Sequence, residues 1–597
     1  MKEREIGVWG VPEWLVDRLG GVALSALAIL VPLVMWLGFA DGVEFPKHVV
    51  FRGLALVLAL AVLLQAEGRI ALAKHPLLIP LVLLSLFALA STVMSGAPIV
   101  SWSGEDGSWK GSSTWVSVWL GALCAGALAR GRLAHKWSAA ILVSAGLILF
   151  YEMFQALGMD PVSWDPGRRI SYWLMASLGN PVHLGNFLVC AFFISLAVFP
   201  GRSVMAWLFR GLILAGILAT LSRSAVLSLL VGLFVWFIMR RKESRGKGII
   251  MMAAAPAIII PLLDQIERLF SLTRLIGARP QIWEAALRMS SHYPLKGAGP
   301  DLFYSLFPSF AGYSFFSAEP PVVVAESVFL RLPASAHSEL FDTMSMLGLP
   351  ALGLYIWALV VIVNKCRQSQ FLPALVALWV GLQVNPSSVA NSALFWTMAA
   401  IASRSNSLPG KKSARRDAII AGFMGAVILA SMFPVMRLAT AQSYRRESGR
   451  LLFVGDRAGA IDLQSHWGKY AGRIHPRQAF DDASVLSSDS SADGSARARS
   501  MLGYAQAGNP MNMFYVSAAA ELDFNQGRKW NDRHMLLNAE AGFRRTMIMA
   551  PTVLSLHDDL ARVLDLLGRK READAERNIR KAGDVSGVFF SAQPAEK

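Results

Sequence analysis

The sequence predicts an all-α, polytopic membrane protein of about 12–13 transmembrane helices, followed by a C-terminal helical domain outside the membrane. Of its 597 residues, 54% are hydrophobic and only 16% are charged, and the mean hydropathy is +0.45. A soluble protein carries roughly a quarter charged residues, so this deficit favours a chain embedded in lipid. Apolar runs of about 17 to 25 residues, each long enough to cross a ~30 Å hydrocarbon core, recur through most of the chain.

Thirteen apolar runs are long enough to be predicted as spans. They lie at 21–40, 48–66, 76–95, 114–130, 137–157, 183–200, 203–221, 224–240, 248–264, 340–364, 371–387, 389–404 and 417–436. The N-terminal stretch holds acidic residues and no cleavage site before its apolar run, so we expect the first helix to be retained.

Charge and cysteine usage exclude two other classes of protein. The net charge of +16 would suit a nucleic-acid-binding protein, but the basic residues fall in short clusters between apolar runs. Such clusters are typical of topology signals, and no nucleic-acid partner is expected. The three cysteines, Cys124, Cys190 and Cys366, lie in or beside apolar runs, and their spacing fits neither a disulfide framework nor a metal site.

Basic residues sort to one side of the predicted membrane. Alternate loops carry Arg130, Arg132 and Lys136, the segment 240–247, Lys365 and Arg367, and the segment 411–416. The positive-inside rule makes these loops cytoplasmic. The N-terminus is then cytoplasmic, while the 265–338 loop and the C-terminus lie outside.

The chain changes character after residue 436. We divide it into a transmembrane domain, 1–436, and an exterior domain, 437–597, which is charged and lacks a spanning run. Three segments, 455–476, 527–551 and 568–582, each combine a glycine-containing charged turn with an amphipathic helix. They resemble degenerate tetratricopeptide repeats, a fold that stacks helical hairpins and binds partner proteins. The Ser/Asp/Ala-rich segment 481–500 is expected to be a flexible loop.

Polar residues that could do chemistry gather on the predicted exterior face. They stand in "GRR" at 167–169, "GNPVHLGN" at 179–186, "LSRSA" at 221–225, "ARPQIWE" at 278–284 and "AHSEL" at 336–340. Taken singly, Arg223 could be an interfacial arginine that reaches lipid headgroups, and His337 could be a structural histidine.

The segment "RPQIWEAALRMSSHYPLKGAGPDLF", 279–303, is a long polar interruption between spans. Arg279 and Arg288 lie nine residues apart on its predicted helix, and we expect them on roughly the same face. The alternative is an amphipathic helix whose apolar side rests on the membrane. That side would consist of Ile282, Trp283, Ala286 and Leu287. Pro280 in the first turn would leave the N-terminal amides open to an anion, and the Gly-Ala-Gly turn would lead toward a substrate cavity.

Together these residues suggest a diphosphate site. Arginine offers a rigid fork of donors that matches phosphate oxygens, and several arginines from separate loops suit a diphosphate. Nucleotide sugars are not working substrates outside the cell, so the diphosphate would be lipid-linked. A nearby histidine could take a proton from an attacking hydroxyl. The exterior segments hold no Asp-x-Asp pair, which disfavours a metal-dependent transferase, and no cofactor is expected.

Four segments in order carry a resemblance to a known family. "GNPVHLGNFL", "LSRSAVLSLLVGLF", "RPQIWEAALRMSSHYPLKGAGPDLFYSLFP" and "AHSELFDTMSMLGLPALGLYIW" resemble the O-antigen ligase/polymerase superfamily of membrane glycosyltransferases, over about residues 20–436. The resemblance implies a GT-C-like helical fold and a metal-independent enzyme in the inner membrane of a bacterium. It would transfer a glycan from an undecaprenyl-diphosphate carrier to a lipid, polysaccharide or protein acceptor.

The resemblance also assigns residues. Arg223 and Arg279 would hold the diphosphate, and His337 would act at the reacting centre as a base or as a phosphate ligand. Further substrate-binding candidates are Arg168, Arg169, Asn180, His183 and Arg288.

Three other functions stay open from the sequence. A protein O-oligosaccharyltransferase of the same fold differs only in its acceptor. A transporter of lipid-linked glycans is disfavoured because the spans show no internal symmetry. A non-catalytic envelope scaffold would use the C-terminal repeats to bind partner proteins.

Overall fold

The computed structural model describes residues 12–162, 174–199, 203–240, 278–312, 315–316, 322–324, 327–329, 332–404, 414–463, 475–487 and 491–586. In these ranges the chain is helical apart from a small antiparallel ribbon, in which β1 (Val322–Val324) pairs with β2 (Ser327–Phe329). The predicted all-α membrane class is confirmed.

Among the described residues, seven helices are long and apolar enough to cross a membrane. They are α1 (Glu13–Leu33), α2 (Glu44–Leu64), α7 (Arg132–Ala156), α8 (Pro181–Val198), α10 (Arg223–Arg240), α17 (Leu349–Cys366) and α20 (Ala414–Phe453). The pair α3 (Ala66–Ala73) and α4 (Leu78–Val93), bent by 80°, would make an eighth span if it crosses as one unit.

Four further apolar helices are shorter than a usual span. They are α6 (Ser112–Leu128), α9 (Val204–Ala219), α18 (Leu372–Gln383) and α19 (Val389–Ala402). Twelve of the thirteen predicted spans therefore overlap a helix, and the span predicted at 248–264 lies outside the described residues.

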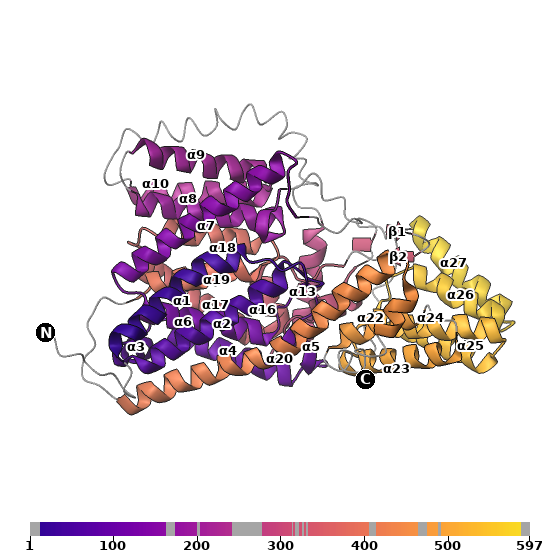
Figure 1. Cartoon of the computed structure of the whole chain (residues 1–597). Helices are drawn as coiled ribbons and strands as arrows, with labels where there is room; N and C mark the ends of the chain where they lie inside the picture. The colour runs from indigo at the N-terminus through magenta and orange to yellow at the C-terminus, as the bar shows by residue number, and fades with distance from the viewer. Residues whose placement is uncertain are drawn as a thin grey trace.

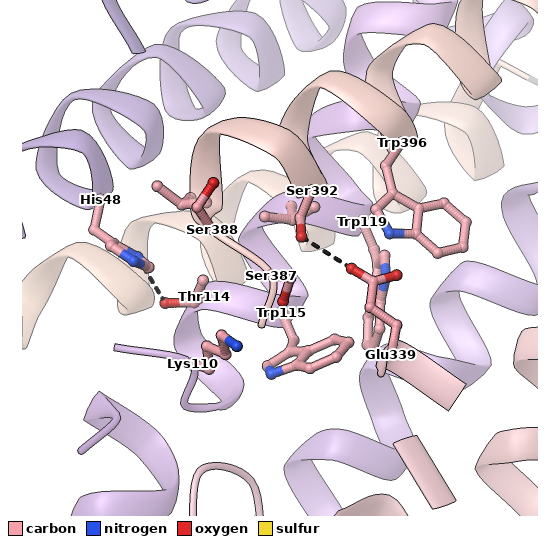
Figure 2. A pocket seen from close by; sticks show the side chains of 12 residues that line it. His48, Lys110, Thr114, Trp115, Trp119, Glu339, Ser387, Ser388, Ser392 and Trp396 are labelled. Atoms are coloured by element: carbon pink, nitrogen blue, oxygen red, sulfur yellow. Dashed lines mark hydrogen bonds between the residues drawn. The ribbon is translucent and has the colours of Figure 1, made fainter. Parts of the chain in front are cut away.

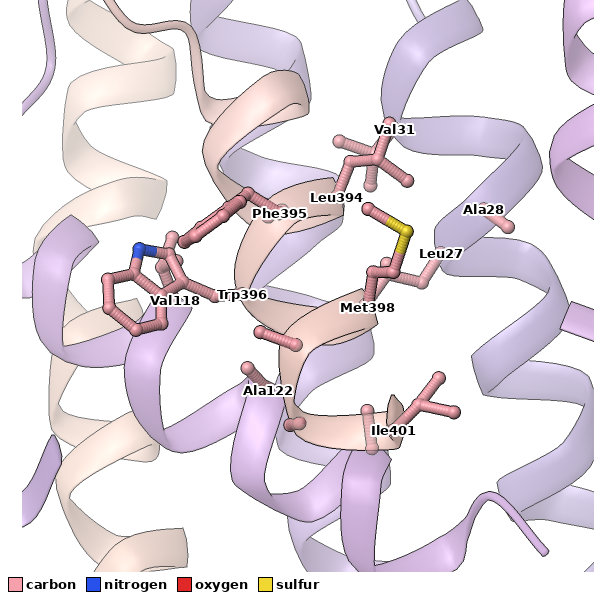
Figure 3. Packing of buried hydrophobic residues seen from close by; sticks show 14 of the residues in the cluster. Leu27, Ala28, Val31, Val118, Ala122, Leu394, Phe395, Trp396, Met398 and Ile401 are labelled. Carbon is pink, nitrogen blue, oxygen red and sulfur yellow. The ribbon is translucent and has the colours of Figure 1, made fainter. Parts of the chain in front are cut away.

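The centre of the membrane body forms around α19, which is buried along nearly its whole length. Figure 3 shows α19 between α1 and α6, with Leu394 and Met398 on the side of Leu27 of α1, and Val118 and Ala122 of α6 on the other side. A helix that is apolar all round is stable only when other helices cover every face. Helix α19 is covered in this way and forms the middle of the bundle.

The predicted span 340–364 is wrong at its N-terminal end. The chain breaks at Gly348 into α16 (Glu339–Leu347) and α17. Gly348 has φ 93°, and a Cβ there would lie 2.5 Å from the carbonyl oxygen of Leu295, so only glycine fits. As a result α16 is a separate buried helix that carries Glu339 and Asp342.

Helix α20 extends well beyond the predicted span at 417–436. Its 40 residues make it about 60 Å long, roughly twice the thickness of the hydrocarbon core. The predicted domain boundary at 436/437 therefore falls inside one continuous helix. Figure 1 shows α20 running the length of the membrane body to the C-terminal helices.

The C-terminal region consists of consecutive antiparallel helices. They are α22 (Pro476–Leu486), α23 (Ala492–Gly508), α24 (Met513–Trp530), α25 (Arg533–Met549), α26 (Ser555–Leu566) and α27 (Lys570–Ser586). The repeats predicted at 527–551 and 568–582 coincide with α25 and α27. Part of the 455–476 repeat lies outside the described residues, and the likeness to tetratricopeptide repeats stays a prediction.

The loop predicted at 481–500 is wrong, because most of this segment belongs to α22 and α23. Ser491 starts α23 as an N-cap whose side chain accepts a hydrogen bond from the amide of Gly494. The alanines and arginines that follow favour helix, and they outweigh the turn-forming serines.

The C-terminal helices sit on the same end of the membrane body as α14 (Phe303–Phe310). Asn509 Nδ2 donates to Ser305 Oγ at 2.9 Å, and Ser309 Oγ donates to the carbonyl of Met549 at 2.6 Å. His475 Nε2 lies 2.9 Å from the carbonyl oxygen of Gly104. Residues near 300 and near 500 must therefore face the same compartment.

We predict that single cysteines at Lys296 and Ser500, both exposed, react with a membrane-impermeant maleimide added to intact cells, whereas a cysteine at Lys247 reacts only after lysis. The native cysteines are all buried and give a low background. Labelling of Lys296Cys and Ser500Cys from opposite sides would contradict the arrangement.

Candidate active site

One buried carboxylate organises the polar end of the membrane body. Asp301 Oδ2 accepts hydrogen bonds from the backbone amides of Glu105 at 2.7 Å and Lys110 at 2.8 Å. Its Oδ1 accepts from Ser108 Oγ at 2.6 Å. Burial raises the pKa of Asp301, and these hydrogen bonds oppose the rise. The loop 104–111, between α5 (Pro98–Ser103) and α6, is held in place by these contacts.

The Gly-Ala-Gly turn places Asp301. The amide of Ala298 donates to the Ser345 carbonyl at 2.9 Å, and that of Gly299 donates to the Met346 carbonyl at 3.0 Å. Gly297 has φ 68°, and a Cβ there would lie 2.2 Å from the Met346 carbonyl. The turn thus docks on the C-terminal end of α16, where we had expected it to lead toward a substrate cavity.

Helix α13 (Arg279–His292) begins at Arg279 with Pro280 in its first turn, and its N-cap residue Ala278 makes no capping hydrogen bond. Arg279 Nε donates to the Val384 carbonyl at 2.9 Å, which ties the start of the helix to the end of α18. Among the described residues no side chain caps this first turn, and the anion site expected there from Pro280 stays a prediction.

The apolar side of α13 packs on protein. Ile282 and Ala286 are buried in a cluster with α14 (Phe303–Phe310) and α16. Trp283 donates from Nε1 to the Ala336 carbonyl at 3.1 Å and stacks on Phe341 with ring centroids 5.4 Å apart. Of the four residues considered for a membrane-facing side, only Leu287 is strongly exposed, at 52%.

The expectation that Arg279 and Arg288 share a face is wrong. Nine residues at about 100° each turn the helix by two and a half revolutions, which places the two on opposite sides. Arg288 is exposed and donates to Glu284 at 2.6 Å. This position separates Arg288 from Arg279.

Arg223, Arg279 and His337 come together at one end of the bundle. Arg223 begins α10 directly after the tight turn at Leu221, which has φ 51°. Burial and the charge of Arg223 lower the pKa of Arg279. Burial, with the charges of Lys110 and Arg279, lowers the pKa of His337 to about 4, against a hydrogen bond with Ser335 that raises it. The four charged or titratable groups therefore lie within electrostatic reach of one another.

The backbone around His337 fixes the tautomer of its ring. His337 has φ 56°, a strained conformation for a residue with a side chain. Its Nδ1 lies 2.9 Å from the Ser335 carbonyl oxygen. A carbonyl can only accept, so Nδ1 carries the proton and Nε2 keeps its lone pair. The lowered pKa keeps the ring neutral near pH 7, and Nε2 can then accept a proton.

A cavity close to this group is lined by α2, the 104–111 loop, α6, α16, and α19 with the residues just before it. Figure 2 shows His48 of α2, Lys110 of the 104–111 loop, Glu339 of α16 and Ser392 of α19 around it, with tryptophan side chains as a wall. Glu339 is 1% exposed and accepts hydrogen bonds from Tyr355 and Ser392, both at 2.9 Å. Burial raises the pKa of Glu339 to about 7.

Asn180 and His183 line a separate and larger cleft, with about 1500 Å³ of empty space. Its polar lining consists of Asp41, Glu44, Asp106, Asn180, His183, Arg445, Arg446 and Arg477. Asn180 also caps α8, because its side chain accepts from the amide of Val182 at 2.9 Å. Arg168 and Arg169, predicted to bind substrate, lie outside the described residues.

Residues 208–356 match the family model described as O-antigen ligase. The match covers about a quarter of the chain, and this segment is similar to that family. The matched segment contains Arg223, Arg279 and His337, the three residues that meet at the end of the bundle. No curated protein matches the chain.

Sequence reasoning missed several residues that the structure places near this candidate site, namely His48, Lys110, Asp301 and Glu339. Lys110 stands in a short polar loop between apolar runs and gives no signal of its own. A usable signal existed for His48, because ionisable residues inside a predicted span are costly and mark functional positions. Lys47, His48 and Arg52 all stand within the first turns of α2 and are buried.

A metal ion at this site would need ligands other than the His, Cys, Asp and Glu side chains that the structure describes. In the ranges that the structure describes, no group of three or more His, Cys, Asp or Glu side chains is arranged to bind an ion.

The state of His337 predicts the pH dependence of a reaction in which this residue takes a proton. If neutral Nε2 is the working form, kcat/KM, which reports the free enzyme, stays level between about pH 7 and 5 as far as His337 is concerned and falls toward pH 4. We expect His337→Gln to lower the rate on the order of 10²-fold, because glutamine cannot take the proton.

The alternative, an imidazolium that binds phosphate, has the opposite profile. Its kcat/KM would rise as the pH is lowered from 7 to 5, and that rise would contradict the base role. Initial rates of the wild type and His337→Gln across this range decide between the two.

Proposed function

We propose that the protein transfers a glycan from an undecaprenyl-diphosphate-linked donor to an acceptor on the exterior face of the cytoplasmic membrane. The observation that carries this is the approach of Arg223 to Arg279 beside a neutral His337. Two arginines that converge from separate segments suit an anion with several charged oxygens. A diphosphate is such an anion, and arginine matches its oxygens in a bidentate way.

The chemistry follows from these positions. Nε2 of His337 would take the proton of an acceptor hydroxyl while the oxygen forms a bond to the anomeric carbon of the donor sugar. The bond between that carbon and the phosphate oxygen breaks, and its electron pair leaves with the lipid diphosphate. Negative charge grows on the leaving group, and Arg223 and Arg279 would stabilise it most at that stage. The backbone amides in the first turn of α13 would add hydrogen bonds to the same anion.

The reaction is proposed to be metal-independent, because arginines supply the positive charge that a cation would otherwise supply. The fixed, partly buried position of Arg279 fits this role. Its hydrogen bond to the Val384 carbonyl holds the guanidinium at the entrance of α13.

The acceptor is proposed to approach through the cleft that contains Asn180 and His183. The cleft combines carboxylates, arginines, an amide and a histidine, a mixture that suits the many hydroxyls of a sugar. For an O-antigen ligase, the acceptor would be a lipid-linked core glycan. For a polymerase, it would be the growing polysaccharide chain. A protein acceptor, as in an O-oligosaccharyltransferase, would reach the same cleft past Arg446 and Arg477, close to the C-terminal helices where partner proteins could bind.

The decisive experiment uses the purified protein in detergent with a lipid-linked glycan and an acceptor. We expect release of undecaprenyl diphosphate together with the transferred glycan, at a rate unchanged by excess EDTA. A transporter would need two compartments and would release no lipid diphosphate. Loss of activity in EDTA that magnesium or manganese restores would contradict metal independence.

The arginine pair makes a second prediction in the same assay. We expect Arg223→Ala and Arg279→Ala each to lower the transfer rate on the order of 10²-fold or more, because each removes charge-assisted hydrogen bonds to the leaving group. Lysine in either place should rescue poorly, since a point charge cannot make the bidentate contact.

Arg240→Ala is the matched control, because Arg240 ends the helix that Arg223 begins and packs over Trp236 at the opposite end. It should transfer at the wild-type rate. Full activity in both Arg223→Ala and Arg279→Ala would refute the diphosphate assignment.

A further inference from the structure

An apolar groove lies between α4 and α20, near the end of α20 that is remote from the candidate active site. Its lining consists of Leu78, Ile79, Val82 and Leu83 of α4, with Ile419, Ile420, Phe423 and Met424 of α20. The groove has about 760 Å³ of empty space, a volume in the range of sites that hold small molecules. All of these lining residues are apolar, so the groove suits a hydrocarbon chain.

The groove exists because α4 and α20 do not pack closely on each other. Both helices pack on α6, and α20 also packs on α3. Helix α3 is bent by 80° from α4, so that it runs toward α20 while α4 stands apart. Ile79 and Ile419, one from each helix, are 60% and 63% exposed. The groove therefore opens on the outer surface of the membrane body, where lipid chains lie.

The groove and the candidate active site lie in opposite halves of the membrane. Arg445 of α20 pairs with Asp106 of the 104–111 loop. Ile419 precedes Arg445 by 26 residues on the same helix, which is about 39 Å at 1.5 Å per residue. That length exceeds the ~30 Å hydrocarbon core. The groove thus belongs to the leaflet that the charge pattern predicts to be cytoplasmic.

Two arginines stand one helical turn before the groove, on the same face of α20. Arg415 precedes Ile419 by four residues and Arg416 precedes Ile420 by four, and side chains with this spacing are neighbours on a helix. Both arginines are exposed. Arg416 lies 3.8 Å from Asp417, but its side chain is 70% exposed, and an exposed pair at this distance is weak.

Lys74 adds a third positive charge, on the side of α4. It is the C-cap residue of α3 and stands four residues before Leu78, the first groove residue of α4. Its side chain is exposed. A basic residue at the membrane surface strengthens the binding of an anionic lipid by roughly five-fold. The groove therefore combines an apolar lining with cations at its cytoplasmic end.

We propose that the groove binds a chain of an anionic phospholipid of the cytoplasmic leaflet, and that Arg415 and Arg416 hold the phosphate of this lipid. The chain alone would select nothing, because the surrounding lipid is as apolar as the groove. Selection comes from the headgroup, whose phosphate oxygens match the guanidinium groups. A lipid bound in this way would fill the gap between α4 and α20 and hold the long helix against the membrane body.

Two lipids with identical chains test the proposal. They are dioleoyl phosphatidylglycerol, which is anionic, and dioleoyl phosphatidylcholine, which is zwitterionic. Their dissociation constants for the full-length protein in detergent are measured by native mass spectrometry. Arg415→Gln/Arg416→Gln removes the headgroup contacts, and Val82→Trp fills the groove. The matched control, Lys365→Gln/Arg367→Gln, removes the same charge from two exposed residues at the end of α17, on the same predicted side of the membrane.

We expect the wild type and the control to bind phosphatidylglycerol on the order of 10-fold or more tightly than phosphatidylcholine in the first binding event. Arg415→Gln/Arg416→Gln should lose this preference, because its binding of phosphatidylglycerol weakens on the order of 10-fold while that of phosphatidylcholine stays the same. Val82→Trp should also bind phosphatidylglycerol more weakly, although both arginines are present, because the chain no longer fits.

Four results would each overturn the proposal. Equal affinity of the wild type for the two lipids would show that the headgroup is not selected. An equal loss in the control and in Arg415→Gln/Arg416→Gln would show attraction by net charge alone. Unchanged binding of phosphatidylglycerol by Val82→Trp would place the chain outside the groove. Displacement of phosphatidylglycerol by uncharged undecaprenol would assign the groove to a polyprenyl chain. The proposed glycosyl transfer, at the other membrane surface, does not depend on any of these outcomes.

Discussion

The hydrogen bonds to the buried carboxylate of Asp301 hold together the end of the molecule that carries the candidate site. One side of this contact is the loop 104–111, and the other is the chain just after the Gly-Ala-Gly turn. The two segments are far apart in sequence and have no regular secondary structure in common. Because three donors converge on one carboxylate away from water, each bond is stronger than its surface counterpart, and an unmatched oxygen would be costly. The direction of Lys110 and the docking of the turn on α16 both depend on this contact.

The same loop also joins the C-terminal helices to the membrane body. Asp106 pairs with Arg445 of α20 at 2.7 Å, and Arg445 pairs with Asp481 of α22 at 2.7 Å. Burial disfavours the charged form of Asp106, but the Arg445 guanidinium holds its pKa below the usual value. His475 adds a contact to the Gly104 carbonyl. The C-terminal helices are thus part of the wall around the site, and any partner protein that moved them would act on the loop that carries Lys110.

Two kinds of buried arginine and lysine can be distinguished here. Arg445 is balanced by carboxylates on both sides and has a structural explanation. Arg279 and Lys110 lie near other positive groups, and their charges together lower the pKa of His337. Lys110 also lies close to the buried carboxylates Asp301, Glu339 and Asp342, and its charge opposes the rise in their pKa values that burial causes.

The sequence by itself determined the helical membrane class and carried the resemblance to the O-antigen ligase superfamily, from which Arg223, Arg279 and His337 are proposed as site residues. Apolar length and charge placement are local properties, and lipid leaves a spanning segment little choice but to form a helix. What depends on contacts between distant residues was decided only by the tertiary structure. The helix breaks at Gly348 because the Leu295 carbonyl lies too close for any side chain there. Arg288 lies away from Arg279 because the turn of α13 places it on the opposite side of the helix. Lys110 looked like an ordinary loop lysine in the sequence. It becomes a buried cation facing a cavity only when Asp301, from a segment almost two hundred residues later, folds its loop against the end of the helix bundle.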